Sequence, residues 1–263
     1  MSTAVAPHAG PVLREWRHRR RLSQLDVSTR TGVSTRHLSY VETGKSKPSR
    51  ELLLHLAEEL EMPQRAINDM LLAAGFAPVF SELDLSDEAL APVRDVIDLV
   101  LAGNDPHPTT VIDIRWDLID ANAAALWMTR GVAAEVLAPV PNVARVCLHP
   151  EGLAPRIRNL PAFASHLLRH MRQVLFATHD PQLAALIDEC ESYVPHGRSE
   201  SAKIADVVLP LEVEVDGYEL AFMSTVTAFG TSRDVTLSEL SIETLYPADA
   251  RTRTVLDERP WAA

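Results

Sequence analysis

The chain has 263 residues and a formal net charge of −11, with 46% apolar and 23% charged residues. This composition is ordinary for a folded globular protein and excludes a wholly disordered chain. No apolar stretch reaches the roughly 18 residues that span a membrane, and no apolar signal core is visible near the N-terminus. Two cysteines, Cys147 and Cys190, are too few for a disulfide framework or a four-cysteine zinc site. We therefore expect a reducing, cytoplasmic compartment and two free thiols.

Positive charge is concentrated at the N-terminal end of the chain. Residues 1–50 contain ten Lys or Arg against three acidic residues, a balance of +7, which leaves −18 on the remainder. A basic segment on an acidic body predicts that one end approaches a polyanion while the rest is repelled from it. The alternative is a basic helix face that is merely solvated, and the charge pattern alone allows both interpretations.

Residues 11–75 carry the signals of five short helices. Apolar spacing and end residues predict these helices at about 11–21, 24–31, 35–42, 50–60 and 63–74. Ser23 with Asp26 forms a variant of the capping box, and Gly32 can supply the positive φ of a tight turn after the second helix. The sequence therefore predicts a small all-α domain at this end of the chain.

The segment 22–49, LSQLDVSTRTGVSTRHLSYVETGKSKPS, has the order helix, glycine turn, helix, glycine stop. Five apolar residues are expected to pack its two short helices at a steep angle, namely Leu25, Val27, Val33, Leu38 and Val41. That packing leaves the outer face of the second helix free, with Thr35, Arg36, Ser39 and Tyr40 on it. Helix-turn-helix proteins place such a face in the DNA major groove.

This segment resembles the helix-turn-helix of lambda-repressor-like regulators of the Cro or Xre type. The matching residues are Leu22-Ser23-Gln24, Gly32-Val33-Ser34, Val41-Glu42, Gly44-Lys45 and Pro48. The resemblance implies an all-α, five-helix domain that binds double-stranded DNA, with Gln24 on phosphate or an adjacent base. It also implies contacts with base edges by Thr35, Arg36, Ser39 and Tyr40. Contacts with the DNA backbone are implied for Lys45, Ser46 and Lys47. Ser34, at the start of the reading helix, completes the predicted DNA-binding set.

The residue types themselves fit these roles. A bidentate arginine such as Arg36 recognises guanine O6 and N7, and each such pair discriminates by about 1–3 kcal/mol. Lys45 and Lys47 add attraction that is independent of sequence and falls with salt. Four further arginines are predicted to reach flanking phosphates, namely Arg17, Arg19, Arg20 and Arg21. The alternative for this domain is a five-helix protein-interaction module.

A connection is expected over 76–104, with a helix that runs to about 101 and is capped by Ser86 or Asp87. Beyond it, strand and helix signals mix. Strands are predicted on both sides of Arg115–Asp117 and at 209–215, 218–229 and 240–246, and helices after Asn122 or Asp120, at 161–178 and from 181 to about 191. Asp216-Gly217 is a preferred type I′ hairpin turn. We therefore predict an α+β domain with an antiparallel sheet over 105–263, after a helical domain over 1–75.

Three stretches of this second domain, 111–128, 159–187 and 222–249, resemble the PAS-like ligand-binding domain of MmyB-like regulators. The resemblance implies a five-stranded antiparallel sheet with helices across one face, and a pocket for a fatty-acid-like or other apolar ligand. The first domain departs from better-known members, whose recognition region is longer and rich in arginine and proline. Candidate lining residues, each of which can equally be plain core, are Trp116, Trp127, Met128, Phe163, Leu167, Met171, Phe222 and Met223. At the pocket mouth or on a wet helix face we place His166, Arg169, His170 and Arg172.

The sequence offers little support for an enzyme activity. No G-x-S-x-G, P-loop, G-x-G-x-x-G or H-E-x-x-H motif occurs, and Cys147 with His149 lacks further metal ligands. We therefore expect no enzyme activity, no cofactor and no metal. The sequence favours a homodimeric DNA-binding regulator that responds to a small apolar ligand. Two alternatives stay open, namely a constitutive DNA binder whose second domain only dimerises, and a regulatory subunit that acts through another protein.

Overall fold

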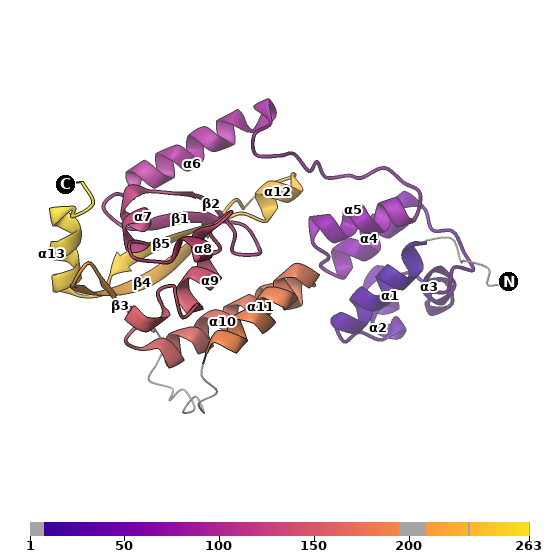
Figure 1. Cartoon of the computed structure of the whole chain (residues 1–263). Coiled ribbons are helices and arrows are strands. Elements are labelled where there is room, and N and C mark those ends of the chain that lie inside the picture. The colour runs from indigo at the N-terminus through magenta and orange to yellow at the C-terminus, as the bar shows by residue number, and fades with distance from the viewer. Residues whose placement is uncertain (1–7, 195–208, 231, 263) are drawn as a thin grey trace. The chain divides into compact units, whose positions relative to one another are not determined.

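A computed structural model describes residues 8–194, 209–230 and 232–262. Parts of both predicted domains, residues 1–7, 195–208, 231 and 263, lie outside these ranges. The chain forms two compact units (Figure 1), the first comprising Met1–Leu83 with Ser232–Val235 and the second Asp84–Thr231 with Thr236–Ala263. Within the described ranges, no helix is long and apolar enough to cross a membrane.

The first unit is built from five short helices. They are α1 (Ala9–Arg19), α2 (Gln24–Thr31), α3 (Thr35–Glu42), α4 (Arg50–Glu59) and α5 (Gln64–Ala73). All five predicted helices are therefore present. The first begins earlier than predicted because His8 caps it, its Nδ1 accepting a hydrogen bond from the backbone N–H of Gly10 at 3.2 Å.

The helix-turn-helix element forms through local signals. The Ser23 hydroxyl accepts from the Asp26 backbone N–H, and the Asp26 carboxylate accepts from the Ser23 backbone N–H at 2.7 Å, so the predicted capping box is confirmed. The Ser23 hydroxyl also donates to the Asp26 carboxylate, and this hydrogen bond, together with that from the Ser23 backbone N–H, holds the pKa of Asp26 below its ordinary value. Gly32 ends α2 with a φ of 72°, which a residue with a Cβ adopts only under strain. Ser34 then caps α3, accepting from the His37 N–H.

The core of this unit is apolar and continuous. Leu13 and Trp16 of α1, Val27 of α2 and Leu38 of α3 are all buried in it. The prediction that Leu25 packs between the two helices is wrong, because its side chain is 65% exposed. Leu25 lies two residues before Val27, so the helical step of about 100° per residue turns it to the opposite face.

A distant segment completes the first unit. The backbone N–H of Val235 donates to the Ser81 carbonyl at 2.7 Å, and the Leu83 N–H donates to Asp234 Oδ2 at 3.1 Å. Gln64 Nε2 donates to the Ser232 carbonyl at 2.6 Å. Residues 76–83, expected in the connection, are therefore tied into this unit together with 232–235.

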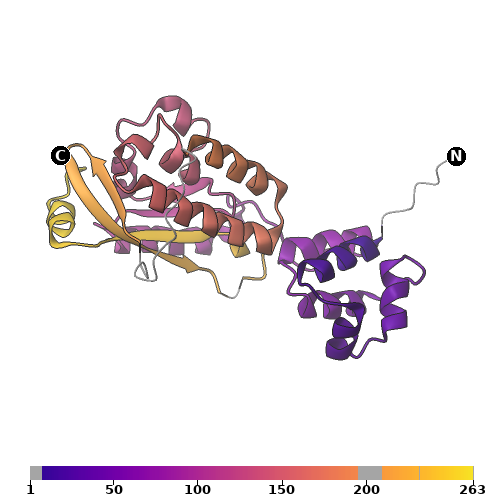
Figure 2. The ribbon, with the colours of Figure 1, turned by 90° about the horizontal axis from the view of Figure 1, so that it is seen from below.

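The second unit contains the predicted antiparallel sheet. Its strands are β1 (Thr109–Ile112), β2 (Leu118–Ala121), β3 (Leu211–Val215), β4 (Tyr218–Ala228) and β5 (Ser241–Pro247). They lie in the order β2-β1-β5-β4-β3, and every neighbouring pair is antiparallel. Figure 2 shows the long orange and yellow strands of this sheet from below. The predicted type I′ turn joins β3 to β4, with φ values of 49° at Asp216 and 81° at Gly217.

Helices of this unit begin at the caps that the sequence suggests. Asp87, Asn122 and Asp180 each accept backbone N–H groups at the start of a helical segment. The helices are α6 (Ala91–Gly103), α7 (Ala123–Met128), α8 (Ala134–Leu137), α9 (Val143–Leu148), α10 (Leu160–Thr178), α11 (Pro181–Tyr193), α12 (Val235–Ser238) and α13 (Ala250–Glu258), with short 3₁₀ turns at Glu88–Leu90 and Ala154–Arg156. Four of these helices, α8, α9, α12 and α13, were not predicted from the sequence, although Asp249 caps α13 by accepting from the Thr252 N–H.

Helices cover both faces of the sheet, not one as the resemblance implies (Figure 1). Val111 and Ile242, from paired strands, pack with Ile97 and Leu101 of α6. Successive strand residues point to opposite faces, so their neighbours face the α9–α11 side. Because the alternate residues on both faces include buried apolar side chains, each face requires a helical cover.

Candidate functional sites

The outer face of α3 presents a coupled pair of side chains. Arg36 and Tyr40, one helical turn apart, are both exposed. Arg36 Nε donates to the Tyr40 hydroxyl at 3.2 Å, and the guanidinium carbon lies 5.4 Å from the centroid of the ring. Thr35 is exposed beside them, and Ser39 is half-buried. The tyrosine thus restrains the guanidinium on the helix surface while leaving its other N–H groups free to meet an acceptor.

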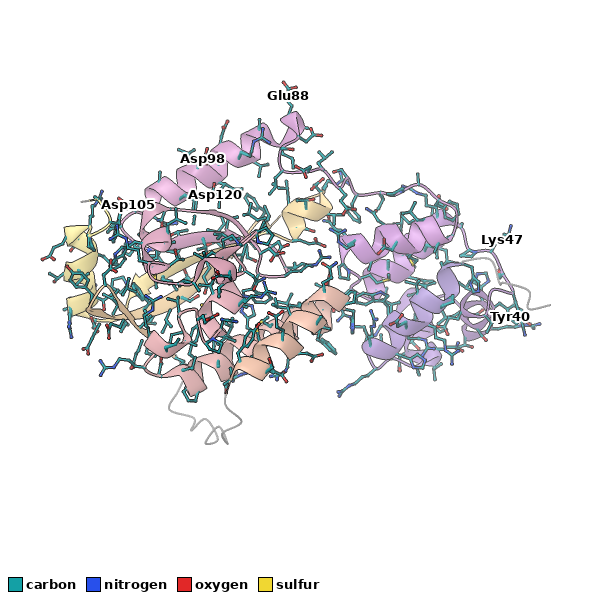
Figure 3. The ribbon with its side chains drawn as sticks, in the orientation of Figure 1. Tyr40, Lys47, Glu88, Asp98, Asp105 and Asp120 are labelled. Atoms are coloured by element: carbon teal, nitrogen blue, oxygen red, sulfur yellow. The ribbon has the colours of Figure 1, made fainter. Side chains whose placement is uncertain are left out.

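The segment after α3 carries the lysines. The backbone N–H groups of Lys45 and Ser46 both donate to the Tyr40 carbonyl, at 2.8 and 3.1 Å, which folds this segment back onto the end of α3. Lys45 Nζ lies 5.9 Å from the Tyr40 ring centroid. Tyr40 and Lys47 both project outward from the unit (Figure 3). The predicted base-reading and backbone-contacting residues therefore gather at one end of this unit.

A buried ion pair joins α3 to α1. Arg17 binds Glu42 through two hydrogen bonds, Nε to Oε1 at 2.7 Å and Nη2 to Oε2 at 2.9 Å, with side chains only 9% and 2% exposed. Gln24 Nε2 also donates to Glu42 Oε2, at 2.8 Å. Burial opposes ionisation of Glu42, but the hydrogen bonds from Arg17 and Gln24 outweigh it, so the pKa of Glu42 lies below its ordinary value. The three partners fasten α1, α2 and α3 together.

The contacts of two arginines differ from the phosphate contacts predicted for them. Arg17 is buried with Glu42, so it does not reach flanking DNA. Arg20 donates from Nε to the Leu60 carbonyl at 2.8 Å and serves the packing of α1 on the end of α4. Arg19 is paired with Glu15, whereas Arg21 is exposed. Gln24, which was predicted to contact DNA, is half-buried. Its amide group donates one N–H to Glu42 and has a second N–H that can donate to another acceptor.

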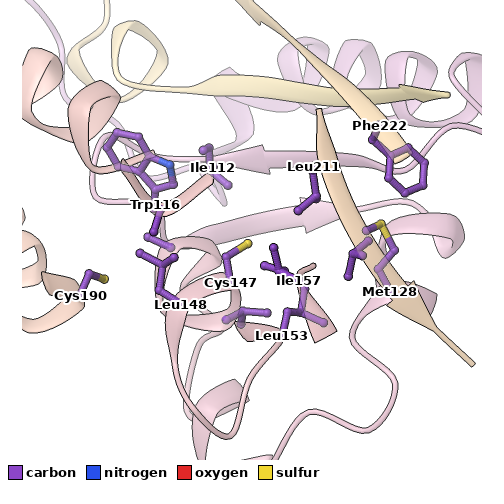
Figure 4. Packing of buried hydrophobic residues seen from close by; sticks show 14 of the residues in the cluster. Ile112, Trp116, Met128, Cys147, Leu148, Leu153, Ile157, Cys190, Leu211 and Phe222 are labelled. Carbon is purple, nitrogen blue, oxygen red and sulfur yellow. The ribbon is translucent and has the colours of Figure 1, made fainter. Parts of the chain in front are cut away.

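The second unit contains an apolar cavity of about 170 Å³. It lies among the sheet, α7, α9 and α10. Five of the eight predicted lining residues do line it, namely Trp116, Met128, Phe163, Leu167 and Phe222. Around it packs the main core of the unit, in which Cys147 lies close to Leu153 and Leu148 (Figure 4). The cavity is thus a gap within an otherwise well-packed apolar core.

Three predicted lining residues lie elsewhere. Trp127 turns its indole N–H to Asp216 Oδ2 at 2.9 Å. Met171 is fully buried in the core, outside the lining. Met223 follows Phe222 along β4, so the strand alternation turns it to the other face, where it is 40% exposed. Residue type alone suggested these three side chains, whereas their direction depends on the helix face for Trp127 and Met171 and on strand alternation for Met223.

Polar side chains also line the cavity. His166 and His170, expected at the pocket mouth or on a wet helix face, come from α10. Thr110, Ser224 and Glu243 come from three strands of the sheet and were not predicted as lining residues. Alternation along 240–246 could have identified Glu243, because Ile242 and Leu240 are core residues of the opposite face. Burial lowers the pKa of His166, Arg169 and His170 lower it further, and Glu243 opposes them.

Neither cysteine has the environment of a reactive thiol. Cys147 lines the cavity and Cys190 lies in the surrounding core, and both are free and buried. Burial raises the pKa of each to about 12, so both are protonated at neutral pH. Among the residues that the structure describes, no group of three or more His, Cys, Asp or Glu side chains could hold a metal ion.

A helix-turn-helix unit joined to an α+β unit with an apolar cavity defines a two-part transcription regulator. Residues 93–258 match the family model described as MmyB-like transcription regulator ligand binding domain, and residues 8–69 match a helix-turn-helix domain. The first match spans more than half of the chain, so the chain belongs to the family of MmyB-like transcription regulators. Both predicted resemblances are thereby confirmed, and the narrower Cro or Xre grouping stays a prediction.

Other comparisons add little to this assignment. No curated protein matches the chain. A solved structure titled "Structure of an RNA-binding Light-Oxygen-Voltage Receptor" matches at 15% identity over 97% of this chain. Its TM-score is 0.28, and the match spans 62% of that protein's length. At this TM-score the likeness has no bearing on fold or function here.

Proposed function

We propose that this protein is a cytoplasmic, homodimeric transcriptional regulator whose sequence-specific DNA binding is controlled by a small apolar ligand. The N-terminal unit is the DNA reader, and the C-terminal unit is the ligand sensor. Both matched families are domains of transcription regulators, which favours a binding function over an enzyme activity. The observation that carries the proposal is the combination of the exposed Arg36–Tyr40 pair on α3 with the apolar cavity.

The DNA-reading role rests on α3. A recognition helix must expose side chains that reach base edges, while cations beside it meet the phosphates. Arg36 and Tyr40 satisfy the first condition, and Lys45 and Lys47 satisfy the second. Gln24 stands at the start of α2, where the helix N-terminus also favours a phosphate. Ser34 uses its hydroxyl to cap α3 and positions the first turn of the reading helix.

The ligand-sensing role rests on the cavity. An engineered cavity of about 150 Å³ in another protein stays dry and binds small apolar molecules, so a void of this size and lining is large enough for a ligand. Trp116, Phe163 and Phe222 supply rigid apolar walls. A fatty-acid-like chain or another apolar body fits this lining, and occupancy restores the packing contacts that the void lacks.

The chain provides two connections through which ligand state can reach the DNA reader. The first unit is followed by α6, and it also includes Ser232–Val235, which lies between β4 and β5 in sequence. A change in the sheet therefore acts on the first unit through the covalent chain at both places. A ligand biases DNA binding only if it binds one arrangement more tightly than the other.

The proposal of a homodimer rests on how helix-turn-helix proteins recognise their operators. Two half-sites one helical turn apart require two reading helices, which a homodimer supplies. On α6, Val96 and Leu99 are 45% and 71% exposed and face away from the core. Exposed apolar side chains of this kind suit an interface with a second copy of the chain.

Replacing Lys45 with alanine is expected to weaken binding to all DNA sequences about equally. The loss of one phosphate contact should reduce the magnitude of the slope of log K against log salt by about 0.9. Fluorescence anisotropy across a salt series, with operator and random duplexes, measures both effects. Arg253→Ala is the matched control, because it removes one exposed cation from α13 of the other unit and should leave the slope unchanged. An unchanged slope in the Lys45 variant would contradict the phosphate contact.

Native mass spectrometry of the purified full chain tests the ligand and dimer proposals together. We expect a dimer that carries a small molecule, and we expect the molecule to be absent from Leu167→Trp, in which the larger ring fills the cavity. Operator binding by that variant should persist but no longer change when apolar molecules are added. Ile119→Trp is the control, since Ile119 lies on β2 outside the cavity lining and is 42% exposed.

Other outcomes favour the alternatives. A dimer without a bound molecule, with an operator affinity that no apolar molecule changes, would favour a constitutive DNA binder whose second unit only dimerises. Absence of any salt-sensitive DNA binding would favour a subunit that acts through another protein.

A further inference from the structure

Among the residues that the structure describes, one acidic side chain, that of Glu243, lines the cavity. Glu243 of β5 pairs in register with Thr110 of β1 on one side and with Val226 of β4 on the other. Its carboxylate accepts a hydrogen bond from the Ser224 hydroxyl, and both residues line the cavity. His166 and His170 line the same cavity from α10. The described lining therefore combines apolar walls with a carboxylate, hydroxyl groups and two imidazoles.

No cationic side chain balances this carboxylate within the described lining. Neither the main cavity nor a neighbouring one of about 90 Å³ is lined by a described Lys or Arg. Trp116, Leu167, His170 and Glu243 line both cavities, so the carboxylate lies where the two adjoin. The neighbouring cavity adds a second acid, Asp113, whose pKa is raised by burial although two backbone N–H groups donate to its carboxylate.

We propose that the cavity selects an amphiphilic amine, with an apolar body among the aromatic walls and an ammonium group at Glu243, over a fatty carboxylate of the same length. This inference rests on the proposed ligand-sensing function and narrows its ligand class. It departs from the fatty-acid-like ligand that the resemblance implies.

The proposed preference for an amine over a carboxylate rests on electrostatic interactions. An ammonium group donates up to three hydrogen bonds, and a charge-assisted bond to Glu243 is shorter and stronger than one between neutral groups. A ligand carboxylate at the same place meets a like charge and no described lining cation to offset it. The lowered pKa of His166 favours its neutral form, which can accept a hydrogen bond from the ammonium but adds no positive charge for a carboxylate. Trp116 also lines both cavities, and indole rings attract cations.

Three probes with one alkyl chain separate head group from body. Decylamine, decanol and decanoate are titrated into the delipidated full chain at neutral pH, below their aggregation limits, by isothermal calorimetry. We expect affinity to fall in the order amine, alcohol, carboxylate, with the amine at least about tenfold tighter than the carboxylate, the low end for one charge-assisted hydrogen bond.

Glu243→Gln then tests the residue. It keeps the shape of the side chain but removes its charge, so the amine-to-carboxylate ratio should fall to near unity while decanol binding changes little. Glu214→Gln is the matched control, because Glu214 lies exposed on β3, outside the lining, and its replacement removes the same charge. The order of the three probes on the unsubstituted chain decides the proposal even if the Glu243 variant fails to fold.

Each result has a distinct meaning. Decanoate binding as tightly as decylamine, or an amine preference that survives in Glu243→Gln, overturns the amine proposal and leaves an apolar ligand sensor intact. Failure of all three probes to bind, together with the absence of a co-purified molecule, overturns the ligand-sensing function and this inference with it.

Discussion

Replacing Glu42 with alanine is expected to destabilise the N-terminal unit by about 3–5 kcal/mol, the range for removing one partner of a buried ion pair. The variant leaves Arg17 charged, almost fully buried and without its carboxylate, and it also deprives Gln24 of an acceptor. Hydrogen exchange of amides in α1–α4, followed by mass spectrometry on the full chain, measures this loss without assuming that both units unfold together. DNA binding should fall with it, since α3 loses its link to α1.

Glu58→Ala is the matched control for this prediction. Glu58 is an exposed acid on α4, and its replacement should change stability by no more than about 0.5 kcal/mol. Unchanged exchange in the Glu42 variant would show that the ion pair contributes nothing net to the fold. The double variant Arg17→Met with Glu42→Leu should recover much of the loss, because an apolar pair leaves no buried charge unpaired.

The same ion pair predicts acid sensitivity. The pKa of Glu42 is lowered in the folded protein, so its contribution to stability is fully present above its unperturbed value of 4.5. That contribution is lost as the pH falls below 4.5 and through the lowered folded value. Amide hydrogen exchange in α1–α3 should therefore accelerate more steeply with falling pH in the unsubstituted chain than in Glu42→Ala. The rates are compared after correction for the intrinsic pH dependence of amide exchange.

Replacing Arg36 with alanine is expected to reduce specific operator affinity by about 1–3 kcal/mol, or about 5- to 150-fold, and to relax preference at one base pair. Tyr40 restrains the guanidinium on the outer face of α3, so the free protein already holds it close to a reading position. Little ordering entropy is then lost on binding. Binding to random DNA should change far less, because Lys45 and Lys47 remain.

Selection of operators from a random library at fixed salt measures the base preference, and anisotropy measures the affinity. Arg30→Ala is the matched control, since Arg30 is exposed at the end of α2 and not on α3. It should leave the selected sequence unchanged. An operator preference that is identical in the Arg36 variant would exclude Arg36 as a base-reading residue. Tyr40→Phe offers a finer test, because it removes only the hydroxyl that accepts from Arg36.

Features with local causes were predictable from sequence. The capping box of Ser23 and Asp26, the positive φ at Gly32 and the Asp216-Gly217 turn each depend on residues a few positions apart. Their hydrogen bonds and dihedral preferences are satisfied wherever the segment lies. The five helices of the first unit and the hairpin of the second were therefore identifiable before any packing was known.

Features that depend on residues far apart in the sequence were not predictable from it. Arg17 has the same charge as Arg21, and only its contact with Glu42, 25 positions away, separates a core residue from a surface one. Glu243 reads as an ordinary polar strand residue until β5 is placed between β1 and β4. Met223 and Phe222 differ in role by one step of strand alternation.

By itself, then, the amino-acid order determined the two-part organisation, the helix-turn-helix, and an antiparallel sheet under apolar helices. Periodicity, caps and turns act over short stretches of chain, and a basic N-terminal segment can be counted. Only the tertiary structure decided which charges are buried, which face each strand residue takes, and that the carboxylate of Glu243 lines the apolar cavity. Those outcomes arise from strand order and helix contact between segments far apart, where desolvation and pairing set the energy of each charge.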